Sequence, residues 1–423
     1  MRICFVADAR SPTARSWITY FVERGHDVRI ISTYPVSSDS YSGATVMEVT
    51  SLTSRQAAPP SPEENRSVRI QQLMPSLVSK VRVGRFAEVA LAIQHWVERS
   101  EVRRRSIAIQ NIIRRIRPDV VHALRLPFEG IMAAIADPAA PLVLSTWGND
   151  LTLFARRFAV TCRLIRRSLD RADALLADCQ RDIILASQFG FAPQKPWLVI
   201  PGGGGVQLDL FGDAAMTPDV RACFSIPANA PLVCNPRGFR PGGVRNDTFF
   251  RAAALTTKAR PDVIFAAVGM RGNAVAERWT ASLGIEGSMR LLPTLSRAEM
   301  FALLKTSDIM VSPSEHDGTP NTLLESMTAG AFPICGDIES IREWITDGLN
   351  GKLRQPSDSE GFAEAILSTV ADTALLASAR QRNQQIVRER AEYTSCMQRA
   401  EKFYERLIRS SAVPAGSFSG ATD

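Results

Sequence analysis

Two carboxylates separated by seven residues frame a predicted helix start in the C-terminal half of the chain. Asp317 lies in the polar loop after the apolar run 309–312, and Glu325 lies inside the helix that Pro320 is expected to open. Between them, the helix N-terminus offers unpaired N–H groups and the positive end of its dipole. This arrangement suits a ligand with hydroxyls at two ends and phosphate in the middle. A nucleotide sugar is such a ligand.

The composition is that of a globular protein with more than one domain. The chain has 423 residues, of which 45% are hydrophobic and 22% charged, so it can bury full cores. The net charge is +7, and arginines gather in the segments 103–117 and 156–171. These arginines fit a solvated helix face, an anionic membrane surface or an acidic substrate. Nucleic acid is not expected as a partner, because no aromatic residues interleave with the arginines.

Cysteine usage predicts a reducing compartment. The seven cysteines are scattered and form no Cys-x-x-Cys pair, so buried free thiols in the cytoplasm are the simplest interpretation. The sequence contains no visible metal-ligand cluster, and neither a metal nor a cofactor is expected. No apolar run approaches the ~18 residues of a membrane span, and the first residues are typical of a strand rather than of a signal peptide.

Short apolar runs alternate with longer amphipathic runs in the first half of the chain. Strands that are buried on both faces and alternate with helices indicate a parallel, doubly wound sheet. Strands are predicted at 2–7, 28–32, 46–49, 119–122, 142–145, 174–177 and 197–200, and helices at 14–24, 86–117, 128–136, 151–170 and 180–189.

A glycine-rich break separates this pattern from a second one. Pro201 and four glycines end the first alternation, and we interpret 206–228 as a linker region. This predicts a Rossmann-like domain at 1–205, a second at 229–390, and a helix with a loose tail at 391–423. Two such α/β domains would face each other across a cleft, where open sheets bind ligands. In the second domain, strands are predicted at 232–235, 263–268, 289–292, 309–312 and 332–335, and helices at 246–258, 274–283, 296–305, 321–329, 338–346, 360–369 and 374–410.

The frame around the two acids resembles the retaining glycosyltransferases of family 4, which have the GT-B architecture. Those enzymes carry two acidic residues separated by seven others, as Asp317 and Glu325 are here. The flanks also match, with Ser312-Pro-Ser before the loop, Glu325-Ser-Met-Thr-Ala-Gly330 in the helix and Gly336 after the next strand. The resemblance implies an acceptor-side first domain, a second domain that binds the nucleotide sugar, and a C-terminal helix that returns toward the first domain.

The resemblance also implies roles for the residues of the frame. Asp317 is expected to contact hydroxyls of the donor sugar, and Glu325 is expected to hydrogen-bond the ribose. A carboxylate accepts two hydroxyl protons at once, which suits a pair of neighbouring hydroxyls. The backbone between the acids would meet sugar or phosphate oxygens, through Gly318, Thr319, Pro320 and Asn321.

Arginines stand where the resemblance places the cations that neutralise the pyrophosphate. Arg237 follows a predicted strand, Arg245 takes the place of an expected lysine, and Arg240 competes for either role. Fixed cations would stabilise the charge that develops on a departing nucleoside diphosphate. In this interpretation they replace the divalent ion that other transferases use.

The resemblance is weaker in the turn expected to bind the base and in the first domain. Leu292 and Pro293 stand in the turn that contacts the base edge through backbone groups in the family. His122 ends a predicted strand, as does a family histidine near the donor sugar or acceptor, and a satisfied structural histidine is the alternative. Trp147 stands where the family has a histidine, in a Trp-Gly-Asn-Asp stretch that ends at Asp150. Its indole would stack on a sugar or pack in the core.

The resulting hypothesis is a retaining glycosyltransferase. It would move a sugar from a UDP- or GDP-sugar to an acceptor hydroxyl by front-face attack, without a metal, and the acceptor would be a saccharide, a lipid-linked compound or a small molecule. The alternatives are a nucleotide-sugar epimerase of GT-B fold, a non-catalytic nucleotide-sugar-binding protein and a dinucleotide-dependent oxidoreductase. No Gly-x-Gly-x-x-Gly motif supports the last. The segment 85–117 has the pattern of an interfacial helix, which would add peripheral contact with the inner face of the membrane, or of a helix packed on the sheet.

Overall fold

The structure is a computed structural model that describes residues 1–37, 40–49, 86–157, 159–211, 219–240 and 242–412. In helix α4 (Phe86–Ile116), only the backbone is described as far as residue 100. The described chain forms two compact units. The first holds the residues up to Gly204 and those from Ser395 onward, and the second holds Gly205–Thr394.

The first unit is built on a seven-stranded parallel sheet with the order β3-β2-β1-β4-β5-β6-β7. The residues from Ile3 to Val6 are fully buried, as expected for a strand covered by helices on both faces. β1 pairs with β2 on one side and with β4 on the other. The strands are β1 (Arg2–Ala7), β2 (Asp27–Ser32), β3 (Thr45–Glu48), β4 (Val120–Ala123), β5 (Leu142–Thr146), β6 (Ala174–Ala177) and β7 (Trp197–Val199).

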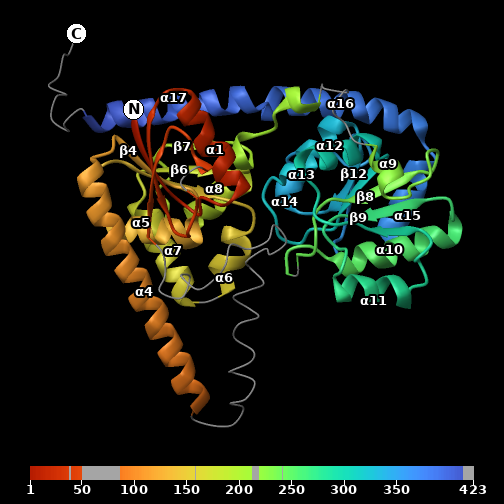
Figure 1. Cartoon of the computed structure of the whole chain (residues 1–423), viewed down its shortest axis with the longest axis horizontal. Helices are drawn as coiled ribbons and strands as arrows, with labels where there is room; N and C mark the ends of the chain where they lie inside the picture. Colours follow the sequence, from red (N-terminus) through yellow and green to blue (C-terminus); the bar gives the residue numbers. More distant parts are fainter. Residues whose placement is uncertain (38–39, 50–85, 158, 212–218, 241, 413–423) are drawn as a thin grey trace. The chain divides into compact units, whose positions relative to one another are not determined.

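Helices cover this sheet, with α5 and α7 on one side of the strands and α17 on the other (Figure 1). The start of α1 is set by Ser11, whose hydroxyl accepts from the Ala14 N–H, and by Pro12, which suits a first turn. Helix α17 packs on α1, where Trp17 Nε1 donates to Tyr404 Oη at 3.1 Å. Besides α4, the elements are α1 (Pro12–Glu23), η3 (Leu126–Gly130), α5 (Ile131–Ala136), η4 (Asp150–Phe154), α6 (Ala155–Arg157), α7 (Ala159–Arg171), α8 (Gln180–Gln188), η5 (Gly202–Gly204) and α17 (Tyr393–Ala412).

The second unit is built on a six-stranded parallel sheet with the order β10-β9-β8-β11-β12-β13. Its strands are β8 (Leu232–Asn235), β9 (Ile264–Ala267), β10 (Met289–Leu291), β11 (Ile309–Ser312), β12 (Phe332–Gly336) and β13 (Lys352–Arg354). Its helices are η6 (Leu208–Phe211), α9 (Val220–Cys223), α10 (Asn246–Ala259), α11 (Ala274–Ser282), α12 (Arg297–Thr306), α13 (Asn321–Ala329), α14 (Glu339–Arg342), α15 (Ser359–Val370) and α16 (Thr373–Ala391).

The structure differs from the predicted elements in several places. The edge strand β13 was not predicted, because it is short and half-buried and has charged residues, Lys352 and Arg354, at its two ends, as is typical of protected sheet edges. The predicted helices 128–136 and 151–170 are each preceded or opened by a π-turn, η3 and η4. The described part of the predicted linker 206–228 belongs to the second unit, because Val206 is buried there and its N–H donates to the Ala391 carbonyl at 2.7 Å.

Among the described residues, no single helix has both the length and the hydropathy of a membrane span. One bent pair, Ser359–Val370 with Thr373–Ala391, meets those criteria only when its two helices are taken together.

Candidate functional site

The predicted arginine and the predicted acid of the second unit follow the ends of neighbouring strands. β8 pairs with β11 in parallel, so the loops that follow Asn235 and Ser312 leave the same edge of the sheet. Arg237 lies on the first loop and Asp317 on the second. Both side chains are buried, with 7% of Arg237 and 9% of Asp317 exposed. The sheet therefore brings together a cation and an acid that are 80 residues apart in the sequence.

Arg237 forms an ion pair with Asp317 and also contacts the helix that follows. Its Nη2 donates to Asp317 Oδ2, and its Nη1 donates to Thr322 Oγ1 at 3.0 Å. The backbone of the loop after β8 is also fixed, because the Asn235 side chain accepts from the Arg237 N–H at 3.0 Å. Arg237 Nε is buried and has no hydrogen-bond partner among the described residues. A buried donor without an acceptor is costly, so this nitrogen is a candidate ligand contact.

The loop that carries Asp317 is held by short polar contacts. Ser314 Oγ donates to Asp317 Oδ2 at 3.4 Å, and the Gly318 N–H donates to Asp317 Oδ1 at 3.1 Å. From helix α14, Ser340 Oγ donates to the Asp317 carbonyl at 2.8 Å. Gly336 on β12 completes the support, since a Cβ there would lie 2.2 Å from the Ser314 carbonyl oxygen. The loop therefore needs a residue without a side chain at this position.

Helix α13 begins at Asn321, as predicted, and Pro320 is its N-cap. Pro320 has no N–H and offers only its carbonyl, which accepts from the Leu323 N–H at 3.0 Å. Thr319 is buried, and its Oγ1 accepts from Trp344 Nε1 at 3.0 Å. In the described part of the chain, the Asn321 N–H has no acceptor. Of the predicted backbone contacts 318–321, the Asn321 amide is available to a ligand.

Glu325 is half-buried in the second turn of α13 and makes no hydrogen bond or ion pair with the other described residues. Burial raises the pKa of Glu325 to about 7, and the nearby charges of Arg297 and Arg237 oppose this shift. A carboxyl group with this pKa exists in both protonation states near neutral pH. It can accept hydrogen bonds from hydroxyls, and its protonated form can also donate one.

The other predicted cations lie differently from Arg237. Arg245 Nε and Nη2 each donate to the Asp247 carboxylate at 2.9 Å, and Nη1 donates to Glu315 at 3.1 Å. These hydrogen bonds raise the pKa of Arg245 and occupy all of its side-chain nitrogens. Arg240 is exposed. Of the predicted arginines, Arg237 alone is ion-paired to Asp317 in the described structure.

The predicted base-binding turn is engaged with the backbone of the loop after β9. The Leu292 carbonyl accepts from the N–H groups of Met270 and Arg271 at 2.9 and 3.0 Å, and the Pro293 carbonyl accepts from Gly269 at 3.1 Å. Leu292 is buried and Pro293 is half-buried. The turn is thus held rigidly beside the sheet, and its carbonyl groups are already hydrogen-bonded.

His122 lies in the core of the first unit, and the structure favours the structural alternative for this residue. Its side chain is fully buried, with Nε2 at 2.7 Å from Ser145 Oγ and Nδ1 at 2.5 Å from Tyr404 Oη. Burial lowers the pKa of His122 to about 3, so the ring stays neutral. With both nitrogens occupied and no exposed surface, His122 is not placed to contact a ligand.

The structure reveals a buried polar cluster in the first unit that was not predicted. Asp150, the last residue of the Trp-Gly-Asn-Asp stretch, is fully buried and accepts from the Trp147 N–H at 3.0 Å and from Arg125 Nε at 3.2 Å. Asp178 accepts from the Gly148 N–H at 2.8 Å. Trp147 is half-buried on the loop that these carboxylates hold. Two acids beside a polar strand end were the sequence signal that could have found the cluster.

The same region contains a group of metal-ligand type, contrary to the expectation of no such cluster. The ligating atoms of Asp178, Cys179 and Asp182 lie within 4.8 Å of one another. Arg181 Nε and Nη2 donate to Asp182 Oδ1 at 3.0 and 2.6 Å. A guanidinium therefore already supplies a positive charge to this group. The proposal of a reaction without a metal stays a prediction.

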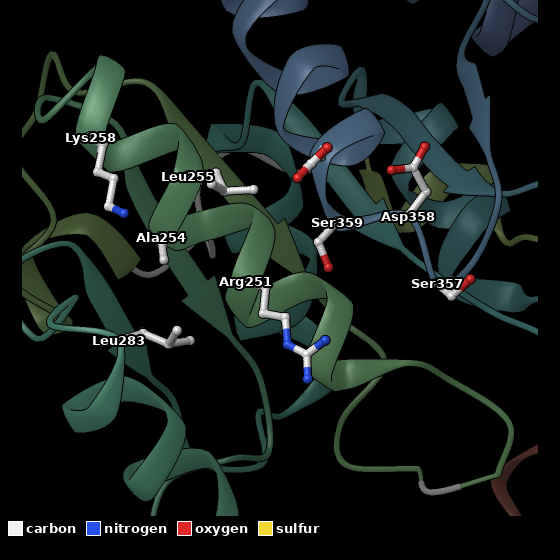
Figure 2. Close-up of a pocket in the computed structure, with 9 residues that line it drawn as sticks. Arg251, Ala254, Leu255, Lys258, Leu283, Ser357, Asp358 and Ser359 are labelled. Atoms are coloured by element: carbon white, nitrogen blue, oxygen red, sulfur yellow. The ribbon is translucent and has the colours of Figure 1, made fainter.

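A cavity of about 440 Å³ lies elsewhere in the second unit, between α10 and the start of α15. Arg251, Leu255 and Lys258 line it from one side and Ser357–Glu360 from the other (Figure 2). None of the predicted site residues lines it. We therefore place the candidate site at the Arg237–Asp317 pair, where the buried polar groups gather.

Parts of the chain and its fold resemble known proteins. Residues 244–386 match the family model of glycosyl transferases group 1, and residues 85–179 match that of the glycosyl transferase 4-like proteins. The structure resembles Anabaena Alr3699/HepE, solved in complex with UDP, with a TM-score of 0.71 and 16% identity over 96% of this chain and 100% of that chain. It also resembles sucrose-phosphate synthase of Thermosynechococcus elongatus, with a TM-score of 0.69 and 14% identity over 97% and 100% of the two chains.

Curated relatives match over shorter segments. D-inositol 3-phosphate glycosyltransferase of Streptosporangium roseum is 26% identical over 206 residues, 46% of each chain. Phosphatidyl-myo-inositol mannosyltransferase of Mycolicibacterium smegmatis is 29% identical over 120 residues, 28% of this chain and 30% of that one. The chain spans about half the length of the D-inositol 3-phosphate glycosyltransferases it matches.

Two parallel-sheet α/β units and these likenesses define a GT-B fold. Two separate segments of the chain match family models of glycosyl transferases. The segment 244–386, which matches the group 1 glycosyl transferases, lies in the second unit and includes Asp317 and Glu325.

Proposed function

We propose that this protein is a retaining glycosyltransferase that moves a sugar from a nucleoside diphosphate sugar to an acceptor hydroxyl. The observation that carries the proposal is the buried Arg237, held against Asp317 and Thr322 at the start of α13, with its Nε left without a partner. A fixed, buried guanidinium beside a helix N-terminus is suited to the diphosphate of such a donor. Asp317 contacts Arg237 directly, and Glu325 lies near enough for the charge of Arg237 to lower its pKa, so two acids are available for the hydroxyl-bearing ends of the donor.

The proposed reaction is front-face attack. The bond between the anomeric carbon and the diphosphate oxygen breaks, the acceptor oxygen bonds to the same face, and the acceptor proton passes to the departing oxygen. Arg237 stabilises the negative charge that develops on the diphosphate. The remaining residues position the donor, so the reaction requires neither a protein nucleophile nor a metal. Retention of configuration follows from attack on the face that the leaving group vacates.

In this mechanism Asp317 holds both Arg237 and the sugar. Its two oxygens accept from Arg237, Ser314 and Gly318, and a carboxylate has further lone pairs for a sugar hydroxyl. Glu325 would hydrogen-bond the ribose, for which its lack of partners in the described structure leaves it available. The donor sugar thus meets an acid that the diphosphate-binding arginine holds in position.

A UDP-sugar is the proposed donor, with a GDP-sugar as the alternative. UDP and UDP-glucose are bound in the solved structures of Alr3699/HepE, whose fold this chain shares. The acceptor is proposed to be a saccharide, a lipid-linked compound or a small molecule. The relatives named for inositol phosphate and phosphatidyl-inositol make a phosphorylated polyol the first acceptor to try.

A thermal-shift screen of the full chain against UDP, GDP and ADP, followed by their sugars, tests the donor. We expect UDP or GDP to raise the melting temperature, and Arg237→Ala and Glu325→Ala to abolish this shift. Arg260→Ala is the matched control. Arg260 lies away from the site and forms an exposed ion pair with Asp262, in which the nitrogen and oxygen are 2.7 Å apart. Variants at 237 and 325 that respond like the parent would refute the site.

Product analysis separates transfer from the two other hypotheses. An epimerase would convert the nucleotide sugar without any acceptor, and a non-catalytic binding protein would bind it and release it unchanged. Transfer requires a new glycoside that forms only when an acceptor is present. Its anomeric configuration, read by NMR, decides whether the enzyme retains or inverts.

Peripheral membrane contact is a second, separate proposal. On helix α4, Ile107 is 50% exposed, and Arg103 and Arg114 on the same helix are exposed. Basic residues beside an exposed apolar side chain suit an anionic bilayer surface. Sedimentation with anionic vesicles at low salt, compared with neutral vesicles, tests this. A protein that stays in the supernatant in both cases would rule the contact out.

A further inference from the structure

Two arginines of the first unit lie on either side of its topological switch point. In the order β3-β2-β1-β4-β5-β6-β7, the strands β1 and β4 are neighbours, and the chain runs outward from them in opposite directions. Open α/β sheets bind ligands at the carboxyl ends of strands at such a point. Arg10 follows β1 and Arg125 follows β4. Neither residue was singled out as a donor-site residue from the sequence.

Arg10 is held in place by a carboxylate and an aromatic ring. Its Nε donates to Asp8 Oδ1 at 2.8 Å, and its Nη2 donates to Asp8 Oδ2 at 2.7 Å. The guanidinium carbon lies 4.1 Å from the centroid of the Tyr34 ring. This leaves Nη1 of Arg10 without an acceptor among the described residues. The group is fixed in orientation, and one of its nitrogens remains to bind.

Arg125 is held in a similar way. Its Nε donates to the buried Asp150, and its guanidinium carbon lies 5.4 Å from the ring centroids of both Phe128 and Phe154. The side chain is 37% exposed, and Nη1 and Nη2 have no acceptor in the described part of the structure. A guanidinium that served only to neutralise Asp150 would present its two-nitrogen fork to that carboxylate. Here only Nε contacts Asp150, so the pair Nη1 and Nη2 remains available to bind a ligand.

The two arginines share one electrostatic environment. Burial opposes the charge of Arg125, but the carboxylates of Asp150, Glu129 and Asp8 raise its pKa overall. Asp8 is thus the ion-pair partner of Arg10 and also a charge felt by Arg125. The acids lock both cations in position, so little side-chain entropy remains to be lost when a ligand binds.

We propose that Arg10 and Arg125 bind an oxyanion of the acceptor, a phosphate or a carboxylate, at the switch point of the first unit. A guanidinium only donates hydrogen bonds, and the two arginines together have three nitrogens without an acceptor among the described residues. The complementary group is therefore an acceptor-only anion. The assignment of this anion to the acceptor substrate rests on the proposed function, whereas the oxyanion site itself does not. The acceptor would thereby be limited to compounds that carry an anionic group beside the reacting hydroxyl.

Calorimetric titration of the full chain tests the site directly. The probes are inorganic phosphate, acetate and D-inositol 3-phosphate, with uncharged inositol as the neutral counterpart. Saturating UDP, or an Arg237→Ala background if UDP does not bind, keeps phosphate out of the donor site. We expect D-inositol 3-phosphate to bind at least about tenfold more tightly than inositol. Comparison of phosphate with acetate distinguishes the two kinds of oxyanion.

The variants Arg10→Gln and Arg125→Gln should each weaken oxyanion binding by about tenfold, and Arg125→Lys should restore it only in part because a lysine lacks the fork. Arg2→Gln is the matched control, since Arg2 lies at the opposite end of β1 and is ion-paired with Asp27 at 2.6 Å. Donor-induced thermal shifts report that each variant folds and still binds nucleotide.

Equal binding by the parent, Arg10→Gln and Arg125→Gln would overturn the inference, as would an equal loss in Arg2→Gln. A loss of UDP binding in Arg125→Gln with unchanged oxyanion binding would also overturn it, because the arginine would then serve the donor. A parent that binds oxyanions through these arginines but binds no nucleotide would instead refute the proposed function and leave the oxyanion site standing.

Discussion

Arg237 and Asp317 form a buried ion pair that ties the end of β8 to the loop before α13. The family resemblance assigns these residues to different parts of the donor, the arginine to the diphosphate and the acid to the sugar. In the structure each is the partner of the other, and Thr322 binds the same guanidinium. If the proposed function holds, donor binding adds contacts to a pair that already exists and is already oriented.

Loss of Arg237 should destabilise the fold as well as donor binding. Arg237→Ala leaves the buried Asp317 without its counterion, and we expect a cost of about 3–5 kcal/mol in the free energy of unfolding. Arg237→Ala with Asp317→Asn should recover part of it, because the uncompensated charge is removed. Denaturant unfolding of both variants measures this. Equal stability of the single and double variants would contradict the pairing.

Stability should depend on the protonation of Glu325. Its pKa is raised by burial from 4.5 to about 7, so the folded state holds a proton that the unfolded state loses. Stability contributed by this group is therefore present below pH 4.5 and is lost as pH rises toward about 7. Glu325→Gln should flatten this part of the profile and stabilise the free protein at pH 8. The same variant should bind the donor more weakly, since the ribose loses its carboxylate.

Chemical unfolding of the parent and Glu325→Gln between pH 4.5 and 8 measures the difference profile. The difference between the two proteins is required because burial also raises the pKa of Glu129 to about 7 and that of Asp150 to about 6. Parallel profiles for the two proteins would show that Glu325 does not titrate in this range.

The backbone contact at Gly336 predicts a sensitive glycine in the second unit. In Gly336→Ala the new Cβ would lie 2.2 Å from the Ser314 carbonyl, so the loop that carries Asp317 must move. We expect a loss of about 1–3 kcal/mol in stability and roughly tenfold weaker donor binding. Gly287→Ala is the matched control, because a Cβ there meets no atom within 4 Å. Donor affinity that is unchanged in Gly336→Ala would argue against a positioned loop.

His122 should prove structural. His122→Ala removes a fully buried ring and leaves Ser145 and Tyr404 without their partner, so we expect a loss of about 3 kcal/mol in stability. Below its melting temperature, the variant should turn over at a rate within about threefold of the parent. Steady-state kinetics and thermal melts measure the two effects. A large fall in kcat with an unchanged melting temperature would restore the catalytic role.

The pattern of the chain predicted most of the elements. β1, β6, β8, β11 and helix α13 have the predicted bounds, because buried parallel strands and amphipathic helices have different hydrophobic periods. The edge strand β13 and the π-turns before α5 and α6 were missed, since a half-buried edge and an extra residue in a helical turn leave little trace in the period. The Asp317–Glu325 frame was visible because its residues are close in sequence.

The amino-acid sequence alone determined the local properties of this protein: alternating strands and helices, two acids across a helix start, and arginines after strands. Tertiary structure decided which of those groups meet. It paired Arg237 with Asp317, and it bound Arg245 to Asp247 and Glu315 by hydrogen bonds. It also buried His122 against Tyr404, a residue 282 positions away in the sequence. The reason is physical: hydrophobic periods depend on neighbours in sequence, whereas the partner of a charged or polar side chain depends on strand order, which joins residues far apart along the chain.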